Sequence, residues 1–122
     1  MNEHERINYL EFPSRDLAAT KHFFTCVFNW SFTDYGAEYT AFSSEAAGLD
    51  GGFYQAELTA SSDSGGALVV FYSKHLEDTL TSIKNCGGSI IKPIYPFPGG
   101  RRFHFADPTG NEFAVWSDRT EA

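Results

Sequence analysis

Residues 103–116 read FHFADPTGNEFAVW, in which two apolar runs flank the turn-forming stretch DPTGN. Alternating apolar and polar residues before this stretch, together with the Asp, Pro, Gly and Asn inside it, predict two antiparallel strands joined by a turn. In the first strand, Phe103 and Phe105 are expected on the core face. Because successive strand residues point to opposite faces, Arg102 and His104 are then expected on the other face.

Working outward from this hairpin, the second half of the chain repeats the first. GLDGGFY at 48–54 aligns with GNEFAVW at 110–116, and YLEFPSRDL at 9–17 aligns with LVVFYSKHL at 68–76. Under the second alignment, Phe12 falls on Phe71, Ser14 on Ser73, Leu17 on Leu76 and Thr20 on Thr79. Each half reads strand–helix–strand–strand–strand, and the matching order of elements indicates a tandem duplication.

Each half contains one predicted helix after its first strand. In the first half the helix is expected from about 17 to 28, with an N-cap environment at 14–16 and a turn at Asn29. In the second half Ser73 is the candidate cap, and the glycines at 87–88 end the helix because glycine tolerates the left-handed C-terminal conformation.

The length of 122 residues predicts one domain, 1–122. Its two modules are expected at about 6–58 and 66–118, joined by a flexible polar linker at 59–65. Two such copies predict an α+β fold, in which a mostly antiparallel, curved and incompletely closed sheet surrounds a cavity and the helices lie outside.

The overall charge argues against nucleic acid as a partner. Nine basic residues against sixteen acidic ones give a net charge of −7, and the longest basic cluster is the pair Arg101–Arg102. A nucleic-acid interface needs a concentrated positive field on one face. The acidic balance is more compatible with neutral or cationic small ligands.

Neither a membrane span nor a secreted protein is predicted. The longest apolar run is far below the roughly 20 residues that a spanning helix needs, and the start MNEHERINYL is polar and does not resemble a signal peptide. A cytoplasmic location is therefore expected. Cys26 and Cys86 form no C-x-x-C unit and are expected to be reduced, small core residues.

The repeated module, the opening YLEFPSRDL, the GGF at 51–53 and the closing FADPTGNEFAVW together resemble the vicinal oxygen chelate superfamily. This group includes glyoxalase I, extradiol dioxygenases, and fosfomycin- and bleomycin-resistance proteins. The resemblance extends from Ile7 to Ser117 and implies two βαβββ modules around a cavity.

The resemblance also implies where metal ligands belong. Metal enzymes of the superfamily take His, Gln or Glu ligands from the first and last strand of each module, and these positions fall on Tyr9, Gly52, Leu68 and Ala114. Three of these side chains have no donor atom, and a lone phenol binds a divalent ion poorly. The sequence therefore predicts no metal and no cofactor, and argues against glyoxalase I or extradiol dioxygenase chemistry.

Two polar residues on the expected cavity face are catalytic candidates. Glu11, between apolar neighbours in YLEF, is either a ligand-orienting carboxylate or general base, or the partner of Arg102 or Lys92 in a structural ion pair, or a residue at an exposed rim position. His104 is either an acid–base group or a histidine hydrogen-bonded within the sheet.

A further set of side chains is expected to contact a ligand. Aromatic residues on this face would form a wall for a planar or cationic molecule, although ordinary core packing explains them equally well. Arg102 would clamp an anion, or lie exposed in a hairpin. The candidate ligand-binding residues are Tyr9, Tyr39, Tyr54, Tyr72, Arg102 and Trp116.

Two functions are consistent with these residues. The first is a bleomycin-resistance-like protein that binds a small organic molecule without metal, as a homodimer by resemblance. The alternative is a lyase, isomerase or dioxygenase of the superfamily that uses Glu11 and His104, or a metal site that the alignment misses. Fold alone does not choose between them.

Overall fold

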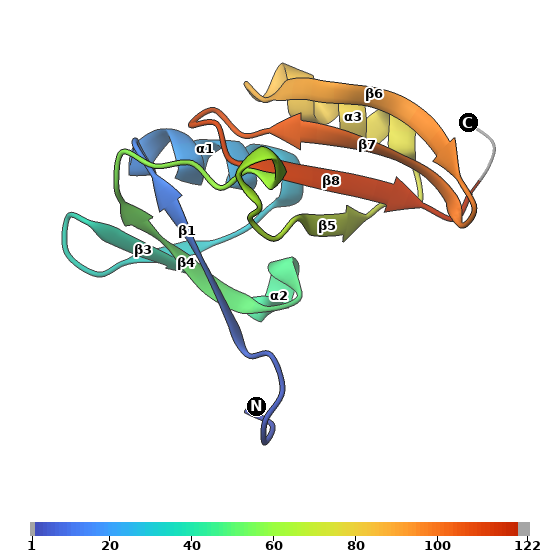
Figure 1. Ribbon diagram of the computed structural model, residues 1–122. Coiled ribbons are helices and arrows are strands. Elements are labelled where there is room, and N and C mark those ends of the chain that lie inside the picture. The colour runs from blue at the N-terminus through green and yellow to red at the C-terminus, as the bar shows by residue number, and fades with distance from the viewer. Residues whose placement is uncertain (1, 120–122) are drawn as a thin grey trace.

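The computed structural model describes residues 2–119, which form two modules with the same order of elements (Figure 1). The first module consists of β1 (Tyr9–Ser14), α1 (Leu17–Phe28), β2 (Phe32–Asp34), β3 (Tyr39–Phe42), the short α2 (Ser44–Ala47) and β4 (Asp50–Gln55). A single 3-10 turn, η1 (Ser62–Ser64), follows. The second module consists of β5 (Val69–Tyr72), α3 (Leu76–Asn85), β6 (Ser89–Phe97), β7 (Gly100–Ala106) and β8 (Glu112–Ser117).

Each module has its own mixed four-stranded sheet. The strand orders are β1-β4-β3-β2 and β5-β8-β7-β6. The pairs β1/β4 and β5/β8 are parallel and the other pairs are antiparallel. The predicted α+β fold with two βαβββ modules is confirmed. The sequence suggested one curved sheet, but the strands form two sheets. β1 and β5 each lie at the edge of their own sheet and do not pair with each other.

The two long helices begin in different ways. Asp16 caps α1, since its carboxylate accepts the Ala19 N–H at 3.1 Å, and Asn29 ends the helix with a left-handed φ of 61°. At α3 the N-cap position is His75, and Ser73 supports the preceding turn by accepting the His75 N–H at 3.0 Å. The predicted span of α1 is confirmed, whereas Ser73 is not the cap residue.

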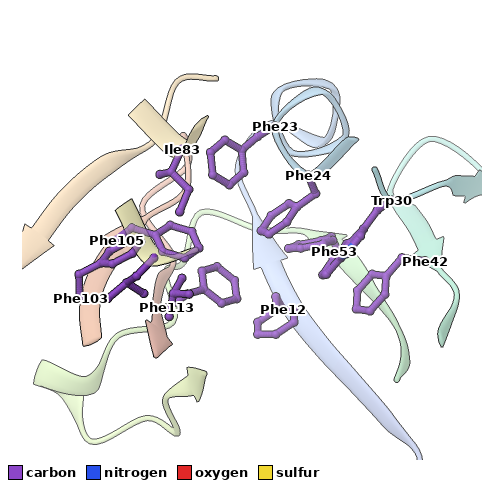
Figure 2. Packing of buried hydrophobic residues seen from close by; sticks show 12 residues of the cluster. Phe12, Phe23, Phe24, Trp30, Phe42, Phe53, Ile83, Phe103, Phe105 and Phe113 are labelled. Atoms are coloured by element: carbon purple, nitrogen blue, oxygen red, sulfur yellow. The ribbon is translucent and has the colours of Figure 1, made fainter. Parts of the chain in front are cut away.

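One aromatic core joins the two modules (Figure 2). Phe24 of α1 contacts Phe53 of the first sheet and Phe113 of the second, with ring centroids 5.4 and 5.5 Å apart. Phe12 of β1 also meets Phe113 at 5.3 Å. Because these rings are shared, neither module can bury its apolar face without the other.

The stretch between the modules, where a polar linker is expected at 59–65, makes hydrogen bonds to the second module. The Asn111 Oδ1 accepts the Ala60 N–H at 2.8 Å, and the Glu112 N–H donates to the Ala60 carbonyl at 2.8 Å. The Asn111 side chain also donates from Nδ2 to the Pro13 carbonyl at 2.7 Å. The DPTGN turn thus fastens the linker and β1 to β8.

Cys26 of α1 and Cys86 at the end of α3 form a disulfide with a Cα–Cα distance of 6.0 Å. The expectation of two reduced cysteines in the core is wrong. Cys26 is exposed and Cys86 half-buried, because the shared core brings α1 and α3 into contact along their solvent-facing edges.

Within residues 2–119 no helix is long and apolar enough to cross a membrane.

Candidate functional site

Each sheet has one face against the aromatic core and one face turned away from it, which we call the open face. On β7 the rings of Phe103 and Phe105 are fully buried, as predicted for the core face. The open face of the first module carries Tyr9, Glu11, Tyr39 and Tyr54. The open face of the second module carries Tyr72, Tyr95, Arg102, His104, Glu112 and Trp116.

On the first open face, two phenols and one carboxylate form a hydrogen-bonded chain. The Tyr39 O–H donates to Glu11 Oε2 at 2.9 Å, and the Tyr9 and Tyr39 hydroxyls lie 2.6 Å apart. Burial, followed by these two hydrogen bonds, raises the pKa of Tyr39. Within residues 2–119 Glu11 makes no ion pair with Arg102 or Lys92, because both cations lie on the other sheet.

The expected metal-ligand positions do not fit a divalent ion. A Cβ added at Gly52 would overlap the hydroxyl of Tyr39, so that phenol fills the place of a ligand there. Ala114 is fully buried and offers no donor. The nearby donors are two phenols and the Glu11 carboxylate. Residues 2–119 contain no group of three or more His, Cys, Asp or Glu side chains arranged to hold a metal.

On the second open face, His104 is the centre of a polar network. Its Nδ1 lies 3.0 Å from Glu112 Oε2, and its Nε2 lies 3.0 Å from the Tyr95 hydroxyl and 3.2 Å from Arg102 Nη2. Glu112 Oε1 accepts from both the backbone N–H and the hydroxyl of Ser62. The His104 hydrogen bond, with the two from Ser62, lowers the pKa of Glu112 to about 2.

The contacts of His104 define its tautomer. A guanidinium can only donate, so Nε2 accepts from Arg102 and carries the lone pair. The ring proton is then on Nδ1, from which it is donated to the ionised Glu112. The imidazole of His104 is thereby oriented by a carboxylate on one side and by a cation on the other.

Aromatic rings surround Arg102. Trp116 lies directly opposite Arg102 in the β7/β8 pairing and opposite Tyr72 in the β5/β8 pairing. The Tyr72 and Phe97 rings meet Trp116 edge to face, with centroids 5.1 and 6.2 Å away. The guanidinium carbon of Arg102 lies 6.0 Å from the Phe97 ring centroid. Cation and aromatic surface thus occupy one region.

The eight site residues that the sequence predicted fall into two groups, one on each open face. Glu11 and His104, proposed as one acid–base pair, lie on different sheets and share no hydrogen bond within the described residues. Tyr95, Phe97 and Glu112 lie beside the second group but were not among the predicted site residues. Alternation along the last strand places Glu112 on the same face as Ala114 and Trp116, although it does not assign Glu112 a role. Tyr95 could not be placed in this way, because register shifts in β6 break the alternation there.

An apolar cavity of about 390 Å³ is lined by residues of both modules. Its walls include Phe12, Trp30 and Phe71, together with Val70 of β5 and Leu49, which follows α2. Of the predicted ligand-binding residues only Tyr72 contributes to it. The predicted aromatic wall therefore does not enclose this cavity.

Comparison with known proteins identifies the architecture. The model of the Glyoxalase/Bleomycin resistance protein/Dioxygenase superfamily matches residues 6–115. The chain therefore belongs to this superfamily, with the resemblance predicted from its motifs confirmed.

Individual relatives are more distant. The anthracycline biosynthesis proteins DauV of Streptomyces sp. (strain C5) and DnrV of Streptomyces peucetius are each 31% identical over 124 residues, covering 88% of this chain and 45% of theirs. The chain thus spans about half the length of these relatives. The fosfomycin resistance protein FosX of Listeria monocytogenes has the same fold, with a TM-score of 0.76, 19% identity and 94% of both chains covered.

Proposed function

We propose that this protein binds a small organic molecule on its open faces, without the metal that superfamily enzymes use. The observation that carries the proposal is the exposure of aromatic side chains there: Tyr9, Tyr54 and Tyr72 are 44%, 37% and 47% exposed. A ligand that covers these aromatic rings removes them from water, which favours binding. The Tyr hydroxyls can orient that ligand through hydrogen bonds. The polar groups beside them supply hydrogen bonds on both faces.

The ligand that fits best is planar and aromatic. Trp116, Tyr72 and Phe97 present ring edges and faces close together on the second open face. The relation to two anthracycline biosynthesis proteins supports the same chemistry, because anthracyclines are fused-ring aromatic compounds. The half-length match leaves those proteins' other half without a counterpart in this chain.

A homodimer is part of the proposal. The two open faces belong to separate sheets, and each leaves aromatic side chains partly in water. A second copy placed over them would enclose the ligand on two sides. Sedimentation showing a stable monomer at micromolar concentration would contradict this part of the proposal.

A catalytic function has one observation in its favour, the His104–Glu112 pair. An imidazole oriented by a carboxylate is the arrangement of a general base. His104→Gln should then abolish turnover of any substrate that is discovered, whereas Glu11→Gln should leave kcat unchanged even if KM rises, because Glu11 lies on the other sheet. Turnover that survives His104→Gln would eliminate this alternative.

The binding proposal is tested by a library of planar aromatic compounds, followed by NMR of ¹⁵N-labelled protein. Binding should shift the indole resonance of Trp116 and leave that of Trp30, which is buried in the core, in place. Shifts confined to Trp30 would show that the ligand binds in the cavity between the modules instead.

Titration with Ni²⁺, Zn²⁺, Mn²⁺ and Fe²⁺ should give no stoichiometric binding, and one tightly held ion per chain would contradict the metal-free proposal.

A further inference from the structure

We propose that Arg102 binds an anionic group of the ligand, so that the second open face selects planar aromatic acids over their neutral analogues. This inference rests on the proposed function for the location of the site and adds the charge of the ligand. It depends on three features of Arg102: the lack of a carboxylate in contact with its guanidinium, its unused donors and its aromatic surroundings.

Arg102 has no anionic partner within residues 2–119. The neighbouring Arg101 forms an ion pair with Glu77 of α3, on the opposite side of the sheet. Glu112, the carboxylate of the same network, makes its contacts with His104 and Ser62 and no ion pair with Arg102. The His104 ring stands between the two charged groups, so no carboxylate of the described chain touches the guanidinium of Arg102.

The donors of Arg102 are also incompletely used. Nη2 donates to His104 Nε2 at 3.2 Å, the one hydrogen bond that this guanidinium makes to the described chain. Nε is buried and has no acceptor there. The buried Nε is out of reach of a ligand, but Nη1 makes no hydrogen bond to the described chain and is not buried, so it can donate to a carboxylate-type ligand. The planar fork of Arg matches two oxygens of one acid group.

The residues around Arg102 indicate which uncharged part of the ligand fits beside the acid group. Phe97 lies next to the guanidinium and Trp116 lies opposite Arg102 on β8. Apolar rings keep water away from the charge, which strengthens its attraction to an anion. An aromatic body on Trp116 with an acid group at Arg102 satisfies both parts of the site.

Because the net charge of the protein is −7, a preference for anionic ligands would point to a local positive group. The composition alone favours neutral or cationic ligands, since the overall field repels anions. Anion binding at this face must therefore come from a local cation. The pair Arg101 and Arg102 separates the two effects, because removing either one changes the net charge equally while only Arg102 lies on the open face.

The test compares 2-naphthoate with 2-naphthamide, which have the same rings and differ in charge. Affinity is measured from the Trp116 indole shift in the full chain, with Trp30 as the internal reference. We expect the acid to bind at least about tenfold more tightly than the amide. Arg102→Gln should remove the preference, Arg102→Lys should retain part of it, and Arg101→Gln should keep it intact.

Each outcome decides between the two proposals. Equal affinity of acid and amide for the unmodified protein overturns the role of Arg102 while leaving aromatic binding in place, and this comparison needs no variant to fold. A preference lost equally in Arg101→Gln and Arg102→Gln would trace it to net charge and also overturns the inference. If neither compound moves the Trp116 signal, the open face is not the ligand site and both proposals fall.

Discussion

The hydroxyl of Tyr39 lies in the space that a side chain at position 52 would need, so Tyr39 and Gly52 depend on each other. From this position Tyr39 also donates to Glu11 and contacts the hydroxyl of Tyr9. A metal ligand therefore cannot be restored at position 52 by one substitution, because the phenol already occupies its place.

Gly52→Ala should lower the free energy of unfolding by about 1–3 kcal/mol, the usual cost of an added methyl that displaces packed atoms. The displaced Tyr39 would also lose its hydrogen bond to Glu11. In Tyr39→Ser the overlap is gone, and Gly52→Ala should then cost little. A double-mutant cycle by urea denaturation measures the difference, and additive effects of the two changes would contradict the dependence.

Asn111 is a second position where a single side chain joins distant parts of the chain. Its amide holds the Pro13 carbonyl of β1 and the Ala60 N–H between the modules, and it is fully buried. Asn111→Ala would leave both backbone groups without partners, at an expected cost of about 2–4 kcal/mol. The exposed Asn8 is the matched control, and Asn8→Ala should change stability by less than about 0.5 kcal/mol. Similar effects of the two changes in urea denaturation would contradict the role of Asn111.

The sequence predicted those features that repeat. Ser14 and Thr20, aligned with Ser73 and Thr79, form the same side-chain hydrogen bond in both modules, at 2.8 and 2.7 Å. Alternation along β7 separated Phe103 and Phe105 from the polar face because no bulge interrupts that strand opposite β8. Local pattern was sufficient wherever the backbone was regular.

The features that could not be predicted depend on how elements lie against each other. Cys26 and Cys86 are not at aligned positions of the repeat, so only the contact between α1 and α3 brings them together. Tyr95 reaches His104 from a strand whose register shifts on either side of Lys92. The position of the Tyr39 ring over Gly52 depends on the rotamer of Tyr39, which the periodicity of the sequence does not predict.

Reduction of the Cys26–Cys86 disulfide should lower stability. The bond closes a loop with a sequence separation of 60, and the chain-entropy model gives about 4 kcal/mol for such a loop, with about 2–4 kcal/mol typical of measured cases. Thermal unfolding with and without a reductant tests this, and the Cys26→Ser/Cys86→Ser variant should match the reduced protein and no longer respond to the reductant. Two alkylatable thiols in the native protein without reductant would contradict the bond.

Glu112 should make stability depend on pH in the acid range. Its pKa of about 2 in the folded protein is below the usual value of 4.5. A carboxyl group with a lowered folded pKa stabilises the protein above 4.5, and this contribution, up to about 3 kcal/mol, is lost as the pH falls toward 2. Glu112→Gln should therefore be less stable near neutral pH, and should lose less stability between pH 5 and 2.

Urea denaturation of both proteins across this range isolates the effect of Glu112. Burial raises the pKa of Asp107, which opposes the trend expected from Glu112. Because Asp107 is present in both proteins, its contribution cancels in the difference between their free energies of unfolding. That difference should be largest above pH 5 and shrink as Glu112 takes up its proton. A difference that stays constant from pH 5 to 2 would mean that the Glu112 carboxylate gains nothing from His104 and Ser62.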